Sequence, residues 1–451
     1  MPEEAEECGG EGVAAPARPG PARTRLPAGW PVLLLFAAFP LWWLLGLSAL
    51  IWMLLAVPML AWLAVRPGVR VPKGFGLWIA FLGWMLFSAT QLDQPKYWIA
   101  FSYRAALYVS MTILFIYVYN LPRAAVPSRK IALALTSLWA VVVVFGFLAL
   151  AFPDVRIATP AAQLLPGGLA GNPFVQDLFN PKLAQVQYFV GYPVPRPAAP
   201  FTYTNEWGGA MGLLTPLAIA SLGLLRSHLV RNLVRLLLVA SLVPMVVSQN
   251  RGLWIGLGVG LLYMAALVAL RGKAGALVAI LASLVLAVGL VAFTPPLRQL
   301  VEDRVANPHS NERRASLGEQ AVEGALQSPL LGYGGPRESA ENPNQPDVGT
   351  HGQVYLVLFS HGIPGLVFFL GWWLWALWVS RRGRIGLPLW AHAVLLIGLI
   401  EFLYYDMMPT ELHLMMVVAA IAWRELEADA RPDLPARTAR PVRERPSPAV
   451  R

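Results

Sequence analysis

One cysteine occurs among the 451 residues, Cys8, so the sequence offers no disulfide framework and cysteine says nothing about the redox compartment. Charged residues are also scarce at 13%, whereas hydrophobic residues make up 57%. This composition is typical of polytopic membrane proteins and excludes a soluble globular protein, which would leave too much apolar surface in water. The formal net charge is +10. Many of the basic residues lie in short loops beside apolar segments or in the C-terminal tail, which indicates membrane topology rather than nucleic-acid binding.

Several chemical motifs are missing from the sequence. It contains no Asp-x-Asp pair, no Cys/His metal cluster, no nucleotide-binding Gly-rich loop and no Gly-x-Ser-x-Gly turn. We therefore expect neither a metal nor a cofactor. The charge of a phosphate ligand would then be neutralised by arginine rather than by Mg²⁺.

Long apolar segments predict an all-α polytopic membrane protein with about twelve transmembrane helices. Residues 30–65 are about twice as long as the roughly 20 residues that one spanning helix needs, so we expect two helices divided near Gly46–Ser48. The other expected spans are Phe75–Thr90, Trp98–Leu121, Ile131–Phe152, Gly208–Leu225, Leu233–Val247, Leu253–Leu270, Ala274–Phe293, Val354–Val379, Leu387–Met407 and Thr410–Trp423.

The loops between these spans alternate in charge. Residues 1–29 and the basic residues 425–451 are expected to be disordered cytoplasmic tails that flank a transmembrane domain at 30–424. Every second loop is basic, as cytoplasmic loops should be; these loops lie at 66–73, 123–130, 226–235, 271–273 and 381–384. The two long loops, at about 153–207 and 294–350, then face outward together.

Arginines on the outer side are unexpected there and are candidates for function: Arg196, Arg251, Arg313 and Arg314. Arg251 lies in a short polar break, SQNRG, and Gly252 beside it would let a ligand approach the backbone. A guanidinium suits bidentate phosphate binding, and the alternative is an arginine that reaches the lipid headgroups.

An amphipathic helix is expected at Asn311–Gln327 in the second outer loop. Arg314 shares one face of it with Gly318, Ala321 and Ala325, and these small residues would leave room for a ligand. The alternative is a helix that lies on the membrane surface. Arg313 points in another direction.

His351 lies where this polar loop becomes an apolar helix. Helix starts favour a neutral imidazole, which can accept a proton; the alternative is a histidine that only caps its loop. The Gly/Pro-rich segment 332–350 is a candidate lid. We expect His361 to be packed and hydrogen-bonded rather than catalytic.

Acidic and histidine side chains near the last two spans suggest a different class of function, a transporter with a proton relay. They are Glu401, Asp406, Glu411 and His413.

The order SQNRG, RRASLGEQAVEGALQSPLLGYG and THGQVYLVLFSHGIPGL resembles the O-antigen ligase and polymerase superfamily of bacterial membrane glycosyltransferases. In that family an arginine precedes a PLLG-G segment, and a histidine motif opens the next transmembrane helix. Arg314, Pro329–Gly332 and His351 take those places. Two departures are Gly352, where the family usually has Asn or Ser, and Gly318, where it often has an aromatic residue.

The resemblance implies an O-antigen ligase that transfers O-antigen polysaccharide from undecaprenyl diphosphate to a sugar hydroxyl of lipid A-core. The active site would be periplasmic, in the inner membrane, and the reaction inverting and metal-independent. His351 would be the general base, with Arg314 and Arg251 on the diphosphate.

Further substrate-binding residues expected on this basis are Arg196, Tyr203, Asn205, Arg313 and Gln353, of which Gln353 could also orient the imidazole. A polymerase differs from a ligase only in its acceptor, and a lipid-linked-sugar flippase remains the alternative from another class.

Overall fold

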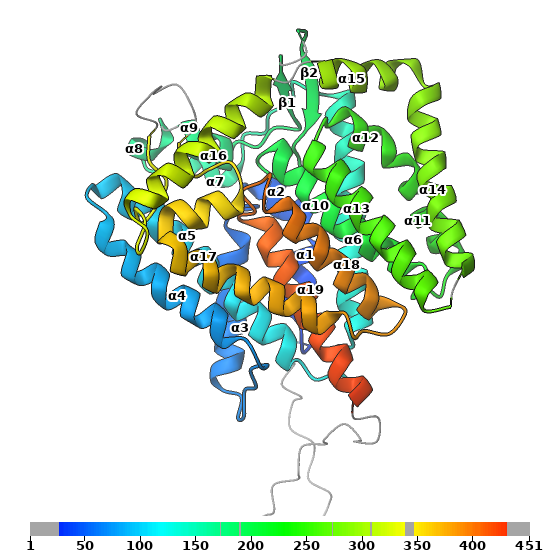
Figure 1. Ribbon diagram of the computed structural model, residues 1–451, viewed down its shortest axis with the longest axis horizontal. Coiled ribbons are helices and arrows are strands. Elements are labelled where there is room, and N and C mark those ends of the chain that lie inside the picture. The colour runs from blue at the N-terminus through cyan, green and yellow to red at the C-terminus, as the bar shows by residue number, and fades with distance from the viewer. Residues whose placement is uncertain are drawn as a thin grey trace, which may run out of the picture.

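The computed structural model describes residues 27–171, 173–188, 191–272, 274–306, 309–338 and 347–430. Helices dominate this part of the chain (Figure 1). In order they are α1 (Trp30–Ala37), α2 (Phe39–Leu45), α3 (Ile51–Ala64), α4 (Gly76–Ser88), η1 (Ala89–Gln91), α5 (Pro95–Asn120), α6 (Ser128–Ala151), α7 (Pro160–Gln163), α8 (Gly167–Ala170), α9 (Pro173–Phe179), α10 (Thr204–Ser221), α11 (His228–Ala240), α12 (Leu242–Val247), α13 (Arg251–Leu270), α14 (Ala274–Phe293), α15 (Pro295–Ala306), α16 (His309–Gln327), α17 (Gln353–Ser380), α18 (Leu387–Glu401) and α19 (Thr410–Ala430).

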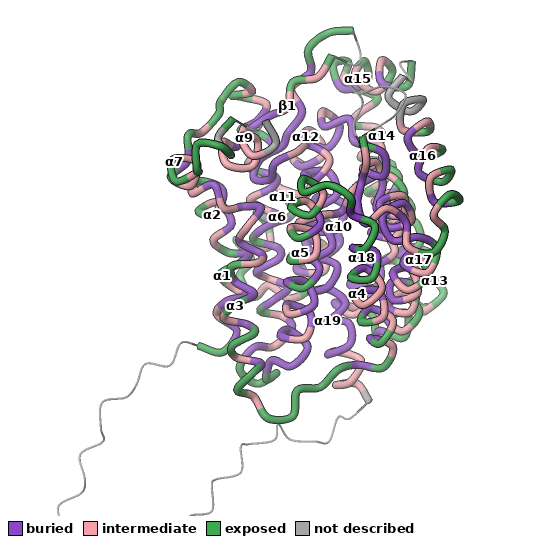
Figure 2. The backbone as a smooth tube through the Cα atoms, turned by 90° about the vertical axis from the view of Figure 1, so that its left-hand side faces the viewer, coloured by how far each residue is buried: buried purple, intermediate pink, exposed green. Residues whose placement is uncertain are grey.

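The core lies around α10 and α19, which are buried over most of their length. Buried residues run through the middle of the bundle, and exposed residues lie mainly toward its outside and its ends (Figure 2). Large aromatic side chains fill the spaces between helices: Trp78, Trp139, Trp207, Trp372 and Trp373 are each under 2% exposed. Because nearly all these helices are apolar on every side, their neighbours rather than their own pattern decide which face is buried.

The first apolar stretch divides where the sequence predicted. Helix α2 ends at Leu45, and Gly46 follows with φ 77°. Helix α3 begins at Ile51. A further break at Ala38 separates α1 from α2.

The expected count of about twelve spans is not confirmed. Five of the described helices are long and apolar enough to cross a membrane, or six if α14 and α15 are taken as one bent span. Helices α3, α4 and α18 are apolar but shorter. The helices at two other expected spans extend beyond the expected bounds and include charged residues: Glu206 in α10, and Arg424 in α19 in addition to Glu411.

The two sets of loops lie at opposite ends of the bundle (Figure 1). At one end, basic loops meet the end of α19, with Arg70 3.4 Å from Glu427 and Arg384 3.1 Å from Asp429. At the other end, Arg337 of the second long loop lies 2.6 Å from Asp93. These contacts agree with the alternation of basic and other loops that the sequence predicts. The compartment on each side stays a prediction.

The first long loop is not purely helical. Strands β1 (Ala184–Gln187) and β2 (Val194–Pro197) form an antiparallel hairpin in which Gln185 faces Arg196. The all-α expectation is wrong for this segment, where strand β1 runs from buried Ala184 to exposed Val186. The hairpin stands at the same end of the molecule as α15 (Figure 1).

The second long loop contains two helices where one was expected. Helix α16 ends at Gln327, as predicted. Helix α15 was missed; it begins at Pro295 and is bent by 92° from α14. A proline at the first position of a helix explains this start, because its missing N–H is not needed there. The bend brings α15 across the end of the bundle (Figure 1).

Helix α17 is interrupted at Gly362, which has φ 67° and ψ −172°. The segment after α16 fits into this break: the N–H groups of Tyr333 and Gly334 donate to the carbonyls of Phe359 and Ser360 at 3.0 and 2.8 Å. The N–H of Ile363 in turn donates to the carbonyl of Pro329 at 2.8 Å, so the PLLG-G and HGIPG segments are in backbone contact.

Candidate active site

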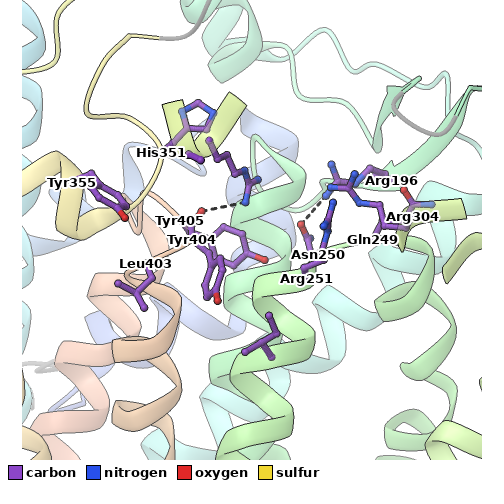
Figure 3. A pocket seen from close by; sticks show the side chains of 13 residues that line it. Arg196, Gln249, Asn250, Arg251, Arg304, His351, Tyr355, Leu403, Tyr404 and Tyr405 are labelled. Carbon is purple, nitrogen blue, oxygen red and sulfur yellow. Dashed lines mark hydrogen bonds between the residues drawn. The ribbon is translucent and has the colours of Figure 1, made fainter. Parts of the chain in front are cut away.

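A pocket of about 410 Å³ opens at the end of the bundle that carries α15 and the hairpin. Figure 3 shows its two sides: Arg196, Gln249, Asn250, Arg251 and Arg304 on one, and His351, Tyr355, Tyr404 and Tyr405 on the other. The lining residues are Arg196, Gln249, Asn250, Arg251, Ile255, Arg304, Arg314, Ala315, His351, Tyr355, Leu403, Tyr404 and Tyr405. Arg196, Arg251, Arg314 and His351, four residues selected from the sequence, therefore surround one space.

Arg196 is held by the turn before α13. It is 5% exposed, donates from Nε to the carbonyl of Ser248, and donates from Nη2 to Oδ1 of Asn250 at 2.7 Å. Gln187 on the facing strand accepts from Nη1. Burial, together with the charges of Arg304 and Arg314, lowers the pKa of Arg196 to about 9. The group stays protonated at neutral pH.

Arg251 is the first residue of α13. The expectation that Gly252 admits a ligand to the backbone is not what the structure shows: a Cβ there would lie 2.6 Å from the ring and hydroxyl of Tyr405. Tyr405 occupies that space, and its hydroxyl accepts a 3.0 Å hydrogen bond from the N–H of Leu253. The glycine is thus needed for packing between α13 and the α18–α19 turn.

Arg304 was missed in the sequence, although it lines the pocket from α15 and is 6% exposed. Burial lowers its pKa to about 10, and repulsion from Arg251 and Arg314 adds to the effect. Pro295–Pro296 could have predicted the start of a helix here. Arg304 would then have been an arginine on a helix of the second long loop, and so a candidate like Arg314.

Arg314 reaches toward the α18–α19 turn, where its Nη1 lies 3.5 Å from the carbonyl of Tyr404. The small residues on its helix face do not make room for a ligand. Ala321 is fully buried in a cluster with Phe359 of α17, and a Cβ on Gly318 would lie 3.3 Å from Tyr355. This face packs α16 against α17 and so places the guanidinium at the pocket.

His351 lies two residues before α17, and its Nδ1 is 3.1 Å from Oγ1 of Thr350. The Thr350 hydroxyl already donates to the carbonyl of Asp347 at 2.7 Å. Its oxygen therefore accepts from Nδ1–H, so in a neutral ring Nε2 is the acceptor. Thr350, rather than Gln353, orients the ring.

Gly352 has φ 130°, a conformation that Asn and Ser rarely adopt. A Cβ there would also lie 2.9 Å from Tyr355 and 3.1 Å from the carbonyl of Leu403. The departure from the family's usual residue thus goes with a tight contact between the start of α17 and the end of α18.

Three expected substrate-binding residues do not line the pocket: Tyr203, Asn205 and Gln353. Gln353 is fully buried, where it donates to the hydroxyl of Tyr108 at 3.0 Å and accepts from the N–H of Met407 at 3.1 Å. The side chain of Arg313, and residues 339–346 of the expected lid, lie outside the described residues. Substrate contacts of Tyr203, Asn205 and Arg313 stay predictions, and those of Gln353 are not supported by its buried position.

Two histidines outside the pocket are packed. His361 is buried, with Nδ1 2.7 Å from the hydroxyl of Ser88, as expected for a structural residue. His413 is buried as well, with Nε2 2.8 Å from the hydroxyl of Ser110. His413, one of the residues suggested for a proton relay, is thus hydrogen-bonded within the protein.

Three carboxylates lie inside the bundle between α10, α18 and α19: Glu206, Glu401 and Glu411. Glu206 accepts a 2.6 Å hydrogen bond from Thr410. A Cβ on Gly209 would meet Glu411, and one on Gly212 would meet Glu401. They form a single buried group at helix contacts, apart from the residues that line the pocket.

The pocket is strongly basic, since four arginines line it and no acidic residue is among its described lining residues. The positive charges of arginines that line one pocket repel one another, and a bound anion relieves that repulsion. A planar guanidinium matches the oxygens of a phosphate group. The arrangement thus favours a polyanionic ligand beside the His351 imidazole.

Comparison with known families agrees with the sequence resemblance. Residues 236–370 match the family model described as O-antigen ligase. No curated protein matches the chain. The matched segment holds Arg251, Arg304, Arg314 and His351, while Arg196 and Tyr405 lie outside it. Over residues 236–370 the chain is therefore similar to the O-antigen ligase family.

Proposed function

We propose that the protein transfers a glycan from undecaprenyl diphosphate to a sugar hydroxyl of lipid A-core at the periplasmic face of the inner membrane. The observation that carries this proposal is the convergence of four arginines and His351 on one pocket. The arginines supply the positive charge that a diphosphate requires. Ile255 and Leu403 at the pocket are partly exposed apolar residues, which suits a lipid-linked substrate.

The reaction is a displacement at the anomeric carbon. Nε2 of His351 takes the proton from the acceptor hydroxyl, and the acceptor oxygen attacks the anomeric carbon of the donor sugar. The bond from that carbon to the diphosphate oxygen breaks, and its electron pair stays on the diphosphate. The arginines stabilise the charge that grows there. Attack from the opposite side inverts the anomeric centre.

The decisive experiment uses the purified protein in vesicles with carrier-linked glycan and lipid A-core, and compares wild type with His351→Ala and Arg314→Ala. We expect both variants to lose at least about 100-fold in transfer, the range for a general base or a charge-stabilising group. Full transfer in both variants would reject the assignment. A chelator should leave wild-type transfer unchanged, and strong inhibition would contradict the arginine argument.

The products also separate the related activities. Glycan on lipid A-core identifies a ligase, longer carrier-linked chains identify a polymerase, and movement of the carrier-linked glycan across the vesicle membrane without transfer identifies a flippase. In the last case Glu401→Gln and Glu411→Gln, rather than the pocket variants, should stop the activity.

A further inference from the structure

Gln249 is a pocket residue whose side chain has no protein partner. It is 1% exposed, and neither Nε2 nor Oε1 has a hydrogen-bond partner among the described residues. A buried amide in this state costs stability, because it has lost its hydrogen bonds to water without replacing them. Since Gln249 lines the pocket, a bound ligand can supply the missing hydrogen bonds.

The backbone at Gln249 is strained as well. Its φ is 51°, and it is the single non-glycine residue with positive φ in the part of the chain that the structure describes. Such conformations persist where the surrounding structure enforces them, and they cluster at ligand sites. Here both neighbours hold Arg196, through the carbonyl of Ser248 and Oδ1 of Asn250. The same turn therefore places the Arg196 guanidinium and the Gln249 amide at one wall of the pocket (Figure 3).

The chemistry of the amide differs from that of the arginines. Guanidinium groups only donate and diphosphate oxygens only accept, whereas an amide does both. A sugar hydroxyl also donates and accepts, so it can satisfy Oε1 as well as Nε2. Gln249 lies on the wall with Arg251 and Arg304, across the pocket from His351 (Figure 3). Under the proposed function, three of the four arginines would hold the diphosphate at this wall, and His351 would face the acceptor.

We propose that Gln249 binds a hydroxyl group of the sugar joined to the diphosphate and thereby selects which donor glycan is transferred. The proposal rests on the proposed function, because it requires the diphosphate to lie among the arginines. It assigns the amide to the donor sugar rather than to the diphosphate or to the acceptor.

The test uses Gln249→Met, an unbranched side chain of similar length that removes both polar atoms. The ligand-free variant should unfold at the same temperature as wild type or higher, because a buried unpaired amide is lost. Its kcat/KM for the carrier-linked glycan should fall about tenfold, as for one lost hydrogen bond. Inhibition by inorganic pyrophosphate, which carries no sugar, should change by less than about twofold.

Gln353→Met is the matched control for stability. Its amide is equally buried but is bonded to Tyr108 and Met407, so this variant should unfold at a lower temperature. If Gln249→Met loses as much stability as Gln353→Met, the amide is structural and the proposal is wrong. If pyrophosphate inhibition weakens as much as transfer, the amide holds the diphosphate and the proposal is again wrong.

Arg314→Ala separates this proposal from the proposed function. Loss of transfer in Arg314→Ala with wild-type kinetics in Gln249→Met rejects the role of Gln249 alone. Full transfer in both Arg314→Ala and His351→Ala rejects the proposed function itself.

Discussion

Nη2 of Arg196 donates a 2.7 Å hydrogen bond to Oδ1 of Asn250, the residue immediately before Arg251. Nδ2 of the same amide donates to the carbonyl of Thr204 at 2.7 Å. A strand of the first outer loop, the start of α10 and the start of α13 are therefore joined through one side chain. This amide is one of three groups that hold the Arg196 guanidinium at the pocket, with the carbonyl of Ser248 and the side chain of Gln187.

Asn250→Ala should therefore weaken inhibition by inorganic pyrophosphate by about tenfold, because Arg196 loses a fixed acceptor. The measurement is the inhibition constant in the vesicle transfer assay. Asn232→Ala is the control, since Asn232 accepts from Arg235 at 2.9 Å on an exposed helix. Equal inhibition constants in Asn250→Ala and wild type would show that Arg196 does not need this contact.

Arg304→Ala should lower kcat/KM by about ten- to a hundredfold, the effect of losing a hydrogen bond to a charged ligand. It should also make transfer less sensitive to salt, because one cation of the pocket is gone. Arg298→Ala on the same helix is the control: Arg298 is exposed and forms an ion pair with Glu302 at 3.4 Å. If both variants lose the same activity, α15 acts through its general charge and not through Arg304.

Tyr405→Phe should lower kcat a few-fold and cost about 1 kcal/mol of stability, because the N–H of Leu253 in the first turn of α13 loses its acceptor. The carbonyl of Tyr405 still accepts from the N–H of Gln353 at 2.7 Å, so the start of α17 should keep its place. Tyr263→Phe is the control, since that hydroxyl pairs with His392 at 2.8 Å away from the pocket. A fall in kcat in Tyr263→Phe equal to that in Tyr405→Phe would count against a local effect.

Gly362→Ala should destabilise the protein by at least about 1–3 kcal/mol, the range for a strained backbone position. Gly362 has φ 67°, and a Cβ there would lie 2.4 Å from the carbonyl oxygen of Leu330. Gly371→Ala in the same helix is the control, because its nearest neighbour would be a Leu77 side-chain atom at 3.5 Å. Thermal unfolding in detergent measures both, and equal midpoints would contradict the importance of the break.

Several residues that line the pocket could be selected from the sequence because non-cytoplasmic loops of membrane proteins contain few positive charges. An arginine on the outer side is unusual, so Arg196, Arg251 and Arg314 could be chosen without a structure, and all three line the pocket with His351. Helix α16 could be predicted because its polar pattern ends at Ser328–Pro329. The roles of these residues in catalysis stay predictions.

Features that depend on contacts between distant segments could not be predicted. Helix α15 looked like a polar loop because its bend of 92° from α14 is a tertiary arrangement. Gly252 and Gly318 looked like space for a ligand, and only the fold shows Tyr405 and Tyr355 in that space. Gln353 lies next to His351 and Gly352 in the sequence but turns into the core, where it meets Tyr108. The expected number of spans is not confirmed either, because several apolar helices are shorter than the length that a single span needs.

The break in α17 concerns membrane insertion as well as packing. A helix interrupted at Gly362 presents backbone carbonyls that lipid cannot satisfy, and unsatisfied groups in hydrocarbon are costly. Tyr333 and Gly334 provide the missing donors. As a candidate membrane span, α17 therefore depends on the segment before it. Its two halves can insert together only when Tyr333 and Gly334 bond to the carbonyls at the break. Truncations or chimaeras of this protein should keep residues 329–363 from one source.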